Sequence, residues 1–113
     1  MCEREKLSRL LKELSQFCAE LFGERLKTVI LFGSYARGDY DEESDIDVMV
    51  VVDMPPEELR GYRRSLADFC ADLNVDNAVF VSPSLQSMEL FERWKEVVPF
   101  YRNVAKEGVE VYG

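Results

Sequence analysis

The sequence predicts an α/β fold of the α+β kind, in which one mixed β-sheet is flanked by helices. Apolar residues recur at helical spacing near the N-terminus, whereas residues 28–32 and 45–52 are rich in β-branched and other apolar side chains. A short connection between the first two strands favours an antiparallel pair, and a helix between the second and third strands permits a parallel crossover. These connections together make the predicted sheet mixed.

The chain is expected to begin with an amphipathic helix that Gly23 can end. Its apolar stripe comprises Leu7, Leu10, Leu11, Leu14, Phe17, Cys18, Leu21 and Phe22. A strand is predicted at 28–32, and it stops abruptly at Gly33 and Ser34. A polar stretch then leads to the second strand, at about 45–52. That strand is apolar on both faces after Asp47, which predicts a central position in the sheet.

Residues 53–56, Asp-Met-Pro-Pro, are predicted to close the second strand and open the second helix. The apolar stripe of that helix comprises Leu59, Tyr62, Leu66, Phe69, Cys70 and Leu73. A third strand is predicted at 75–81, with Asp76 at its start, and 82–84 are expected to cap a third helix that runs to about Trp94. A shorter helix at 100–105 and an edge strand at 109–112 complete the order α-β-β-α-β-α-α-β. We expect a single domain over residues 1–113, without repeats or linkers.

Charge and composition exclude several classes of function. The 22 acidic and 14 basic residues give a net charge of −8, which opposes direct binding of nucleic acid and a templated polymerase activity. The chain has no histidine and three cysteines, so neither a zinc or haem site nor Ser-His or Cys-His catalysis is expected. Free thiols favour a reducing cytoplasm, and Cys18 and Cys70 are expected to pack in the core. The longest apolar run, 48–52, is too short to cross a membrane, so a cytoplasmic location without membrane association is expected.

The predicted topology brings acidic residues to one rim of the sheet. Asp45 and Asp47 are two residues apart on a strand, so they project to the same side with Cα atoms about 7 Å apart. Asp76 is expected to approach from the neighbouring strand. Three hard oxygen ligands suit Mg²⁺ or Mn²⁺, and two such ions ~3.5–4 Å apart would neutralise the carboxylates while gripping a triphosphate.

Gly33 and Ser34 supply a complementary phosphate site. A glycine lets the backbone approach a phosphate, and the amides and hydroxyl that follow can donate hydrogen bonds to it. A helical turn beginning here would add its N-terminal dipole. Each assignment has a structural alternative: Ser34 could only cap a helix, Asp45 and Asp47 could be a solvated strand end, and Asp76 an ordinary polar strand start. Arg37 could steady phosphates or form a surface ion pair and is left outside the predicted site, while Asp39, Asp41, Glu42 and Glu43 are read as a solvated acidic lip.

The spacing Gly33-Ser34, ten residues, then Asp45-Ile46-Asp47 resembles the GSx10DxD signature of the DNA polymerase β-like nucleotidyltransferase superfamily. The chain resembles the minimal nucleotidyltransferase branch of that superfamily over nearly its whole length, and the tail around 100–109 is similar as well. One departure is Asn77, which stands beside Asp76 where an apolar residue is expected. The resemblance implies the polymerase β-like palm fold, with Asp45, Asp47 and Asp76 as metal-binding and catalytic residues and Gly33 and Ser34 at the nucleotide.

The resemblance also implies an activity. It is metal-dependent transfer of AMP from ATP to a hydroxyl group, most simply a tyrosine, of a partner HEPN toxin, with the chain acting as antitoxin and with Mg²⁺ as the metal. Two alternatives stay open: modification of a small hydroxylated molecule such as an aminoglycoside, and a non-catalytic antitoxin that inhibits its partner by binding. The sequence leaves the acceptor residue, the base preference and the formation of homo- or hetero-oligomers undecided.

Overall fold

The computed structural model describes residues 4–41 and 44–112. Cys2, expected to be a free thiol, and Glu42 and Glu43 of the predicted acidic lip lie outside these residues. In chain order the elements are α1 (Arg4–Phe22), a 3₁₀ turn η1 (Gly23–Arg25), β1 (Leu26–Phe32), α2 (Ser34–Arg37), β2 (Ile46–Val52), α3 (Pro56–Leu59), η2 (Arg60–Tyr62), α4 (Arg63–Asn77), β3 (Val81–Ser87), α5 (Met88–Trp94), α6 (Pro99–Glu107) and β4 (Val109–Tyr112).

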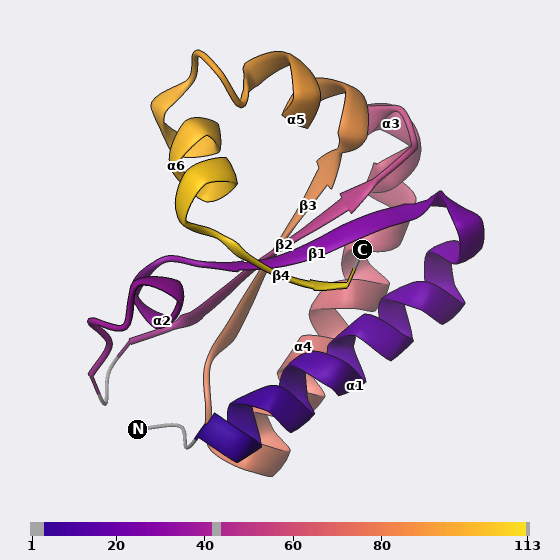
Figure 1. The fold of residues 1–113 in the computed structure, drawn as a ribbon. Coiled ribbons are helices and arrows are strands. Elements are labelled where there is room, and N and C mark those ends of the chain that lie inside the picture. The colour runs from indigo at the N-terminus through magenta and orange to yellow at the C-terminus, as the bar shows by residue number, and fades with distance from the viewer. Residues whose placement is uncertain (1–3, 42–43, 113) are drawn as a thin grey trace.

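The four strands form one mixed sheet in the order β3-β2-β1-β4 (Figure 1). β1 runs antiparallel to both β2 and β4, and β2 runs parallel to β3. The predicted central position of β2 is therefore confirmed, as are the antiparallel first pair and the parallel crossover. All residues of β2 except Asp47 are buried, which matches its near-continuous apolar sequence.

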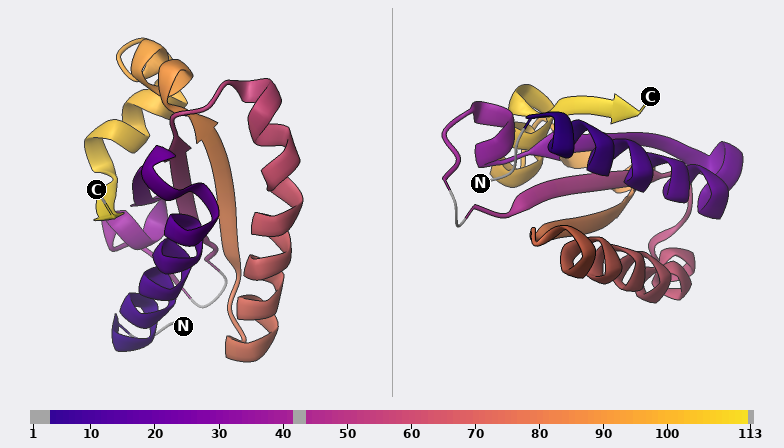
Figure 2. Two further views of the ribbon diagram at one scale, coloured as in Figure 1. Left: turned by 90° about the vertical axis from the view of Figure 1, so that its right-hand side faces the viewer. Right: turned by 90° about the horizontal axis from the view of Figure 1, so that it is seen from below.

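Helices cover both faces of the sheet. α1 and α4 pack on one face, and α5 and α6 pack on the other (Figures 1 and 2). The side chains of β2 alternate between the two layers: Val48, Val50 and Val52 belong to the larger core with α1 and α4, whereas Met49 and Val51 pack with Phe91 and Val104. Among the described residues, no helix combines the length and apolar character that crossing a membrane requires.

The third strand is where the structure departs from the sequence prediction. The expected strand at 75–81 is wrong, because α4 continues to Asn77 and the strand occupies Val81–Ser87 instead. Residues 82–84 therefore lie in β3 rather than at a helix cap, and the next helix starts only at Met88. The helix ends because Ala78 takes a left-handed conformation (φ 53°), and hydrogen bonds from a side chain of α4 then hold the start of the new strand.

The hydrogen bonds that hold the start of β3 come from Asn74, in the last turns of α4. Its side-chain oxygen accepts a hydrogen bond from the backbone N–H of Val81 at 2.7 Å, and its amide nitrogen donates to the Val81 carbonyl at 3.3 Å. Val81 is the first residue of β3 and lies opposite Ile46 of β2. The asparagine thus fixes where β3 begins relative to the start of β2.

Candidate active site

A glycine turn joins β1 to α2. Gly33 has φ +74° and ψ −153°, a combination that is essentially restricted to glycine. Its carbonyl accepts hydrogen bonds from the N–H groups of Ala36 and Arg37, both at 3.1 Å, and this begins the short helix α2 at Ser34. Gly38 ends α2 in the left-handed region at φ +85°. The expected helical turn after Gly33 is confirmed.

Asp45 and Asp47 lie where β2 begins, next to this turn. Asp45 is exposed and directly precedes the strand, while Asp47 is its half-buried second residue. Because Ile46 and Val48 face α1 and α4, the two aspartates project to the opposite face of the sheet. Asp47 lies opposite Phe32, the last residue of β1. The strand ends expected to form the rim are thus brought together.

The side chain of Asp47 lies directly against Gly33. A Cβ atom built on Gly33 would overlap Oδ2 of Asp47 and would come within 3.3 Å of its Cγ. Only a residue without a side chain leaves room for the carboxylate in this position. The glycine of the turn and the second aspartate of the pair are therefore one structural unit.

The electrostatics of the rim disfavour two ionised carboxylates. Burial, and then the nearby charge of Asp45, raises the pKa of the Asp47 carboxyl, and Arg37 offsets part of this rise. A carboxylate that is partly desolvated and beside a like charge is stabilised by a cation.

Arg37 does not supply that cation directly. Its guanidinium pairs with Asp39 at 3.2 Å and with Glu107 of α6 at 3.5 Å. These carboxylates raise the pKa of Arg37, chiefly through the hydrogen bond that its guanidinium donates to Asp39. Of the two alternatives that the sequence leaves open for Arg37, the structure shows the surface ion pair with the acidic loop, and the contact with Glu107 additionally ties α2 to the C-terminal helix.

Asp76 is not at the rim. The prediction that it begins the third strand is wrong, because it lies exposed in the last turn of α4 and borders a groove between α1 and α4. The strand neighbour of Asp47 is instead Ser82. Sequence reasoning missed Ser82 because the run from Val81 to Ser87 contains three serines and a proline and is poor in the residues typical of strands.

The donor set suits a hard divalent cation in part. Asp45 and Asp47 offer carboxylate oxygens of the kind that Mg²⁺ and Mn²⁺ prefer. Because Gly33 has no side chain, it leaves room for the Asp47 oxygen beside the turn. Within 4–41 and 44–112, however, no group of three or more acidic or thiol side chains gathers tightly enough to hold a metal alone. Further oxygen ligands would have to come from bound phosphates or water.

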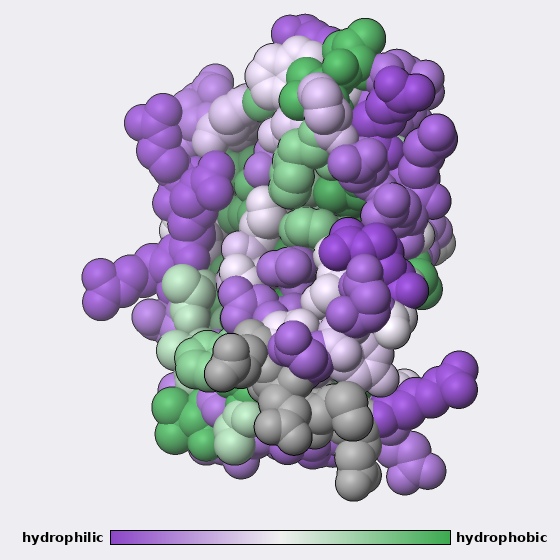
Figure 3. Space-filling view, turned by 90° about the vertical axis from the view of Figure 1, so that its left-hand side faces the viewer, coloured by the Kyte–Doolittle hydropathy of each residue, from purple (hydrophilic) through white to green (hydrophobic). Residues whose placement is uncertain are grey.

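The α6 side of the rim is hollowed. A small pocket of about 210 Å³ lies between the glycine turn and α6, and it is lined by Phe32, Gly33, Arg37, Phe100, Asn103, Val104 and Glu107. The rings of Phe100 and Phe32 meet edge to face, with their centroids 5.7 Å apart. Figure 3 looks onto the side of the molecule that carries α2 and α6 and shows mostly hydrophilic side chains with smaller hydrophobic areas between them.

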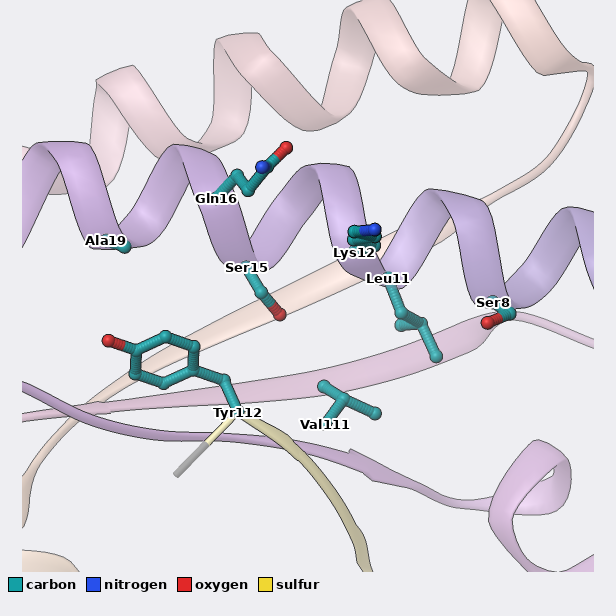
Figure 4. A pocket seen from close by; sticks show the side chains of 8 residues that line it. All are labelled: Ser8, Leu11, Lys12, Ser15, Gln16, Ala19, Val111 and Tyr112. Atoms are coloured by element: carbon teal, nitrogen blue, oxygen red, sulfur yellow. The ribbon is translucent and has the colours of Figure 1, made fainter.

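A separate pocket lies on the other face of the sheet, between α1 and the edge strand β4 (Figure 4). Ser15 and Leu11 of α1 point from the helix toward Val111 and Tyr112 of β4. The hydroxyl of Ser15 is buried and has no hydrogen-bond partner within the described part of the chain. This pocket contains none of the residues that the sequence places at the rim.

A glycine turn that opens onto a short helix, set beside paired carboxylates at the start of a central strand, is an arrangement typical of enzymes that act on nucleoside triphosphates. Comparisons with known proteins identify the family. The chain belongs to the nucleotidyltransferase domain family, whose model matches residues 11–108, and it is a nucleotidyltransferase.

Relatives in Methanocaldococcus jannaschii carry more specific names. The chain is 38% identical over 104 residues to "Putative protein adenylyltransferase MJ0604", a match that covers 92% of this chain and 96% of that protein. It is 34% identical over 83 residues to "Putative protein adenylyltransferase MJ1305", which covers 74% of this chain and 56% of that protein.

Two solved structures share the fold. A "putative nucleotidyltransferase" from Sulfolobus solfataricus is similar with a TM-score of 0.60 and 26% identity, over 91% of this chain and 77% of that one. A chain from a structure of the toxin–antitoxin pair MntA-HpeT has a TM-score of 0.54 and 18% identity, over 94% of this chain and 73% of that one. The predicted mixed sheet flanked by helices, in a nucleotidyltransferase fold, is therefore confirmed.

Proposed function

We propose that this nucleotidyltransferase transfers AMP from ATP to a hydroxyl group of a partner protein. The observation that carries the proposal is the contact between Gly33 and Asp47, which sets the glycine turn directly beside a carboxylate whose pKa is raised and whose charge a cation would stabilise. The names of the M. jannaschii relatives support protein adenylylation as the activity.

In the proposed reaction the acceptor oxygen forms a bond to the α-phosphorus of ATP. The bond from that phosphorus to the bridging oxygen breaks, pyrophosphate leaves with the bonding electron pair, and the hydroxyl proton passes to water. A tyrosine hydroxyl has a pKa of about 10, so it must be activated to react near neutral pH. Mg²⁺ held by Asp45 and Asp47 would neutralise the phosphates and lower the pKa of the acceptor hydroxyl.

The chain's own residues have separate roles in this proposal. The turn at Gly33 and the hydroxyl of Ser34 bind and orient phosphate oxygens, and Asp45 and Asp47 hold the metal. If two ions bind, the phosphates of ATP must supply the remaining ligands, since Asp76 lies on α4.

The acceptor is proposed to be a HEPN-type toxin. This rests on the family resemblance and on the fold shared with a chain of a toxin–antitoxin pair. A protein with a net charge of −8 is a poor binder of nucleic acid, which favours a protein as the acceptor. Adenylate added to a tyrosine would place a bulky anion on the surface of the toxin, where it would oppose the binding of RNA.

The experiment mixes the purified toxin partner with this protein, Mg²⁺ and ATP that is labelled either on the α- or on the γ-phosphate. We expect label from the α-phosphate alone on the toxin, with an adenylate-sized mass increase in intact mass spectrometry. Both should disappear with Asp45→Asn and with Asp47→Asn. Transfer of the γ-phosphate would refute nucleotidyl transfer. Full inhibition of the toxin by the double variant without any mass change would select the non-catalytic antitoxin, and labelling of an added aminoglycoside instead of the toxin would select the small-molecule enzyme.

A further inference from the structure

The outer surface of α1 and α4 carries a groove that the proposed chemistry does not use. It has a volume of about 430 Å³ and is lined by Glu13, Gln16, Phe17, Glu20, Phe69, Asp72, Leu73 and Asp76. Phe17 of α1 and Phe69 of α4 stack face to face across it, with ring centroids 4.1 Å apart and planes 9° apart. Both rings are only half-buried, so their exposed parts add aromatic surface to the groove.

The rims of this groove are acidic. Glu13 and Glu20 lie on the α1 side, and Asp72 and Asp76 lie one turn apart on the α4 side. Glu13 pairs with Arg9 at 3.5 Å, whereas the other three form no ion pair with any described residue. An aromatic surface between two acidic rims is complementary to an apolar stripe flanked by lysine and arginine.

The position of the groove favours a helix as its occupant. It lies between two helices whose backbone groups are bonded internally, and away from the open edges of the sheet at β3 and β4. An extended peptide would find no strand edge to pair with there, whereas a helix satisfies its own backbone and can lay one face between α1 and α4. A second copy of this chain is disfavoured, because it carries the same net charge of −8.

Two exposed apolar residues lie in the segment that leads from the groove to the start of β3. Val75, on α4 beside Asp76, is 83% exposed, and Phe80, just before β3, is 71% exposed. The carbonyl of Phe80 accepts a hydrogen bond from the N–H of Ile46 at 2.7 Å, so this residue adjoins the start of β2 between Asp45 and Asp47. A protein bound in the groove could therefore also contact Val75 and Phe80 and reach the aspartates at the start of β2.

We propose that the groove between α1 and α4 docks a basic amphipathic helix of the acceptor protein, and that Val75 and Phe80 guide the adjoining part of that protein to the site. This inference rests on the proposed function for the identity of the partner as an acceptor. The groove itself is defined by residues that neither bind ATP nor hold the metal in that proposal.

The test uses a designed 18-residue helical peptide with a leucine stripe flanked by lysines, labelled with a fluorophore and titrated with the full chain. We expect amide chemical-shift changes in α1 and α4. In Glu20→Lys/Asp72→Lys the dissociation constant should rise by about tenfold or more, because both rims then repel the peptide. The matched control is Glu57→Lys/Glu96→Lys, which changes the net charge equally at exposed sites elsewhere and should stay within about threefold of the wild type.

A second pair of variants tests Phe80 with a peptide that carries extra leucines beyond the helix. Phe80→Ser should weaken its binding by about threefold or more, whereas Val97→Ser, at a side chain of nearly equal exposure (70%) between α5 and α6, should not.

Mg-ATP binding, measured by thermal shift in the same variants, separates the two proposals. Absence of a Mg-ATP effect in the wild type would contradict the proposed function and leave the peptide result standing. Failure of the wild type to bind the peptide, equal affinity in both charge-reversed doubles, or shift changes outside α1 and α4 would overturn the docking groove even if Mg-ATP binds.

Discussion

Replacing Gly33 with alanine tests the unit formed by the turn and Asp47. The backbone of Gly33 lies in a region that costs any other residue about 1–3 kcal/mol. The new Cβ would also overlap Oδ2 of Asp47, and forcing an atom into an occupied site costs about 1–3 kcal/mol more. We expect Gly33→Ala to lower the free energy of unfolding by about 2–6 kcal/mol, which is a fall in Tm of about 8–24 °C for a domain of this size.

Gly23→Ala is the matched control for this change. Gly23 also has a positive φ, +59°, but a Cβ there would meet nothing within 4 Å. It should therefore cost only about 1–2 kcal/mol, the penalty for a left-handed residue. Chemical denaturation measures both variants, and a thermal shift with Mg-ATP should be lost in Gly33→Ala and kept in Gly23→Ala.

A double-mutant cycle isolates the contact itself. In an Asp47→Ala background the overlapping oxygen is absent, and only the Cβ of residue 47, at 3.5 Å, remains near the new methyl group. The cost of Gly33→Ala should then shrink by about 1–3 kcal/mol toward the cost at Gly23. An equal cost of Gly33→Ala in both backgrounds would refute the reasoning that the glycine is required by the carboxylate.

Three further predictions concern single side chains. Asp47→Asn should stabilise the protein without ligand, and the difference in free energy of unfolding from the wild type, measured in denaturant, should grow from about pH 3 to pH 7. The reason is that the pKa of Asp47 is raised on folding, so the folded wild type loses stability as this carboxyl ionises. A difference that is constant with pH would contradict the assigned cause. Asp76→Asn should leave the Mg-ATP thermal shift unchanged, since Asp76 lies on α4, and loss of that shift would return Asp76 to the metal site. Burial raises the pKa of Cys18 to about 12 and that of Cys70 to about 11. Alkylation of the native protein at pH 8, followed by peptide mass mapping, should therefore be slower than after unfolding by about a thousandfold at Cys18 and about a hundredfold at Cys70.

Patterns within one element predicted much of this structure. The leucine stripe of α1, the valine run of β2 and the Gly33-Ser34 boundary each carry their signal within a short stretch of sequence. The structure has β1 and β2 within two residues of the expected limits, and α1 ends at Phe22, directly before the expected stop at Gly23. The rim formed by β1 and β2 followed from the short connection between them.

The error at the third strand arose where long-range contacts outweigh local preference. Residues 75–81 contain three valines and a phenylalanine, which are typical of a strand. In the structure the side-chain amide nitrogen of Asn77 instead donates to the Leu73 carbonyl at 2.9 Å, and Arg9 of α1 donates to the side-chain oxygen of Asn77 at 3.1 Å. These contacts extend α4 through Asp76, and a contact with a residue 68 positions away in the chain leaves no periodic signal in the sequence.

The side chain of Asn74 has a consequence for how the site is specified. β3 offers little hydrophobic alternation to choose among possible alignments with β2, because serines, a proline and a glutamine fill most of it. The side chain of Asn74 forms hydrogen bonds with both the N–H and the carbonyl of Val81. This local constraint sets the alignment of β3 with β2 that the hydrophobic pattern of β3 does not specify. A helix residue thus decides which β3 side chain is the neighbour of Asp47, and the composition of the strand is left free to vary without moving the end of the sheet that carries Asp47.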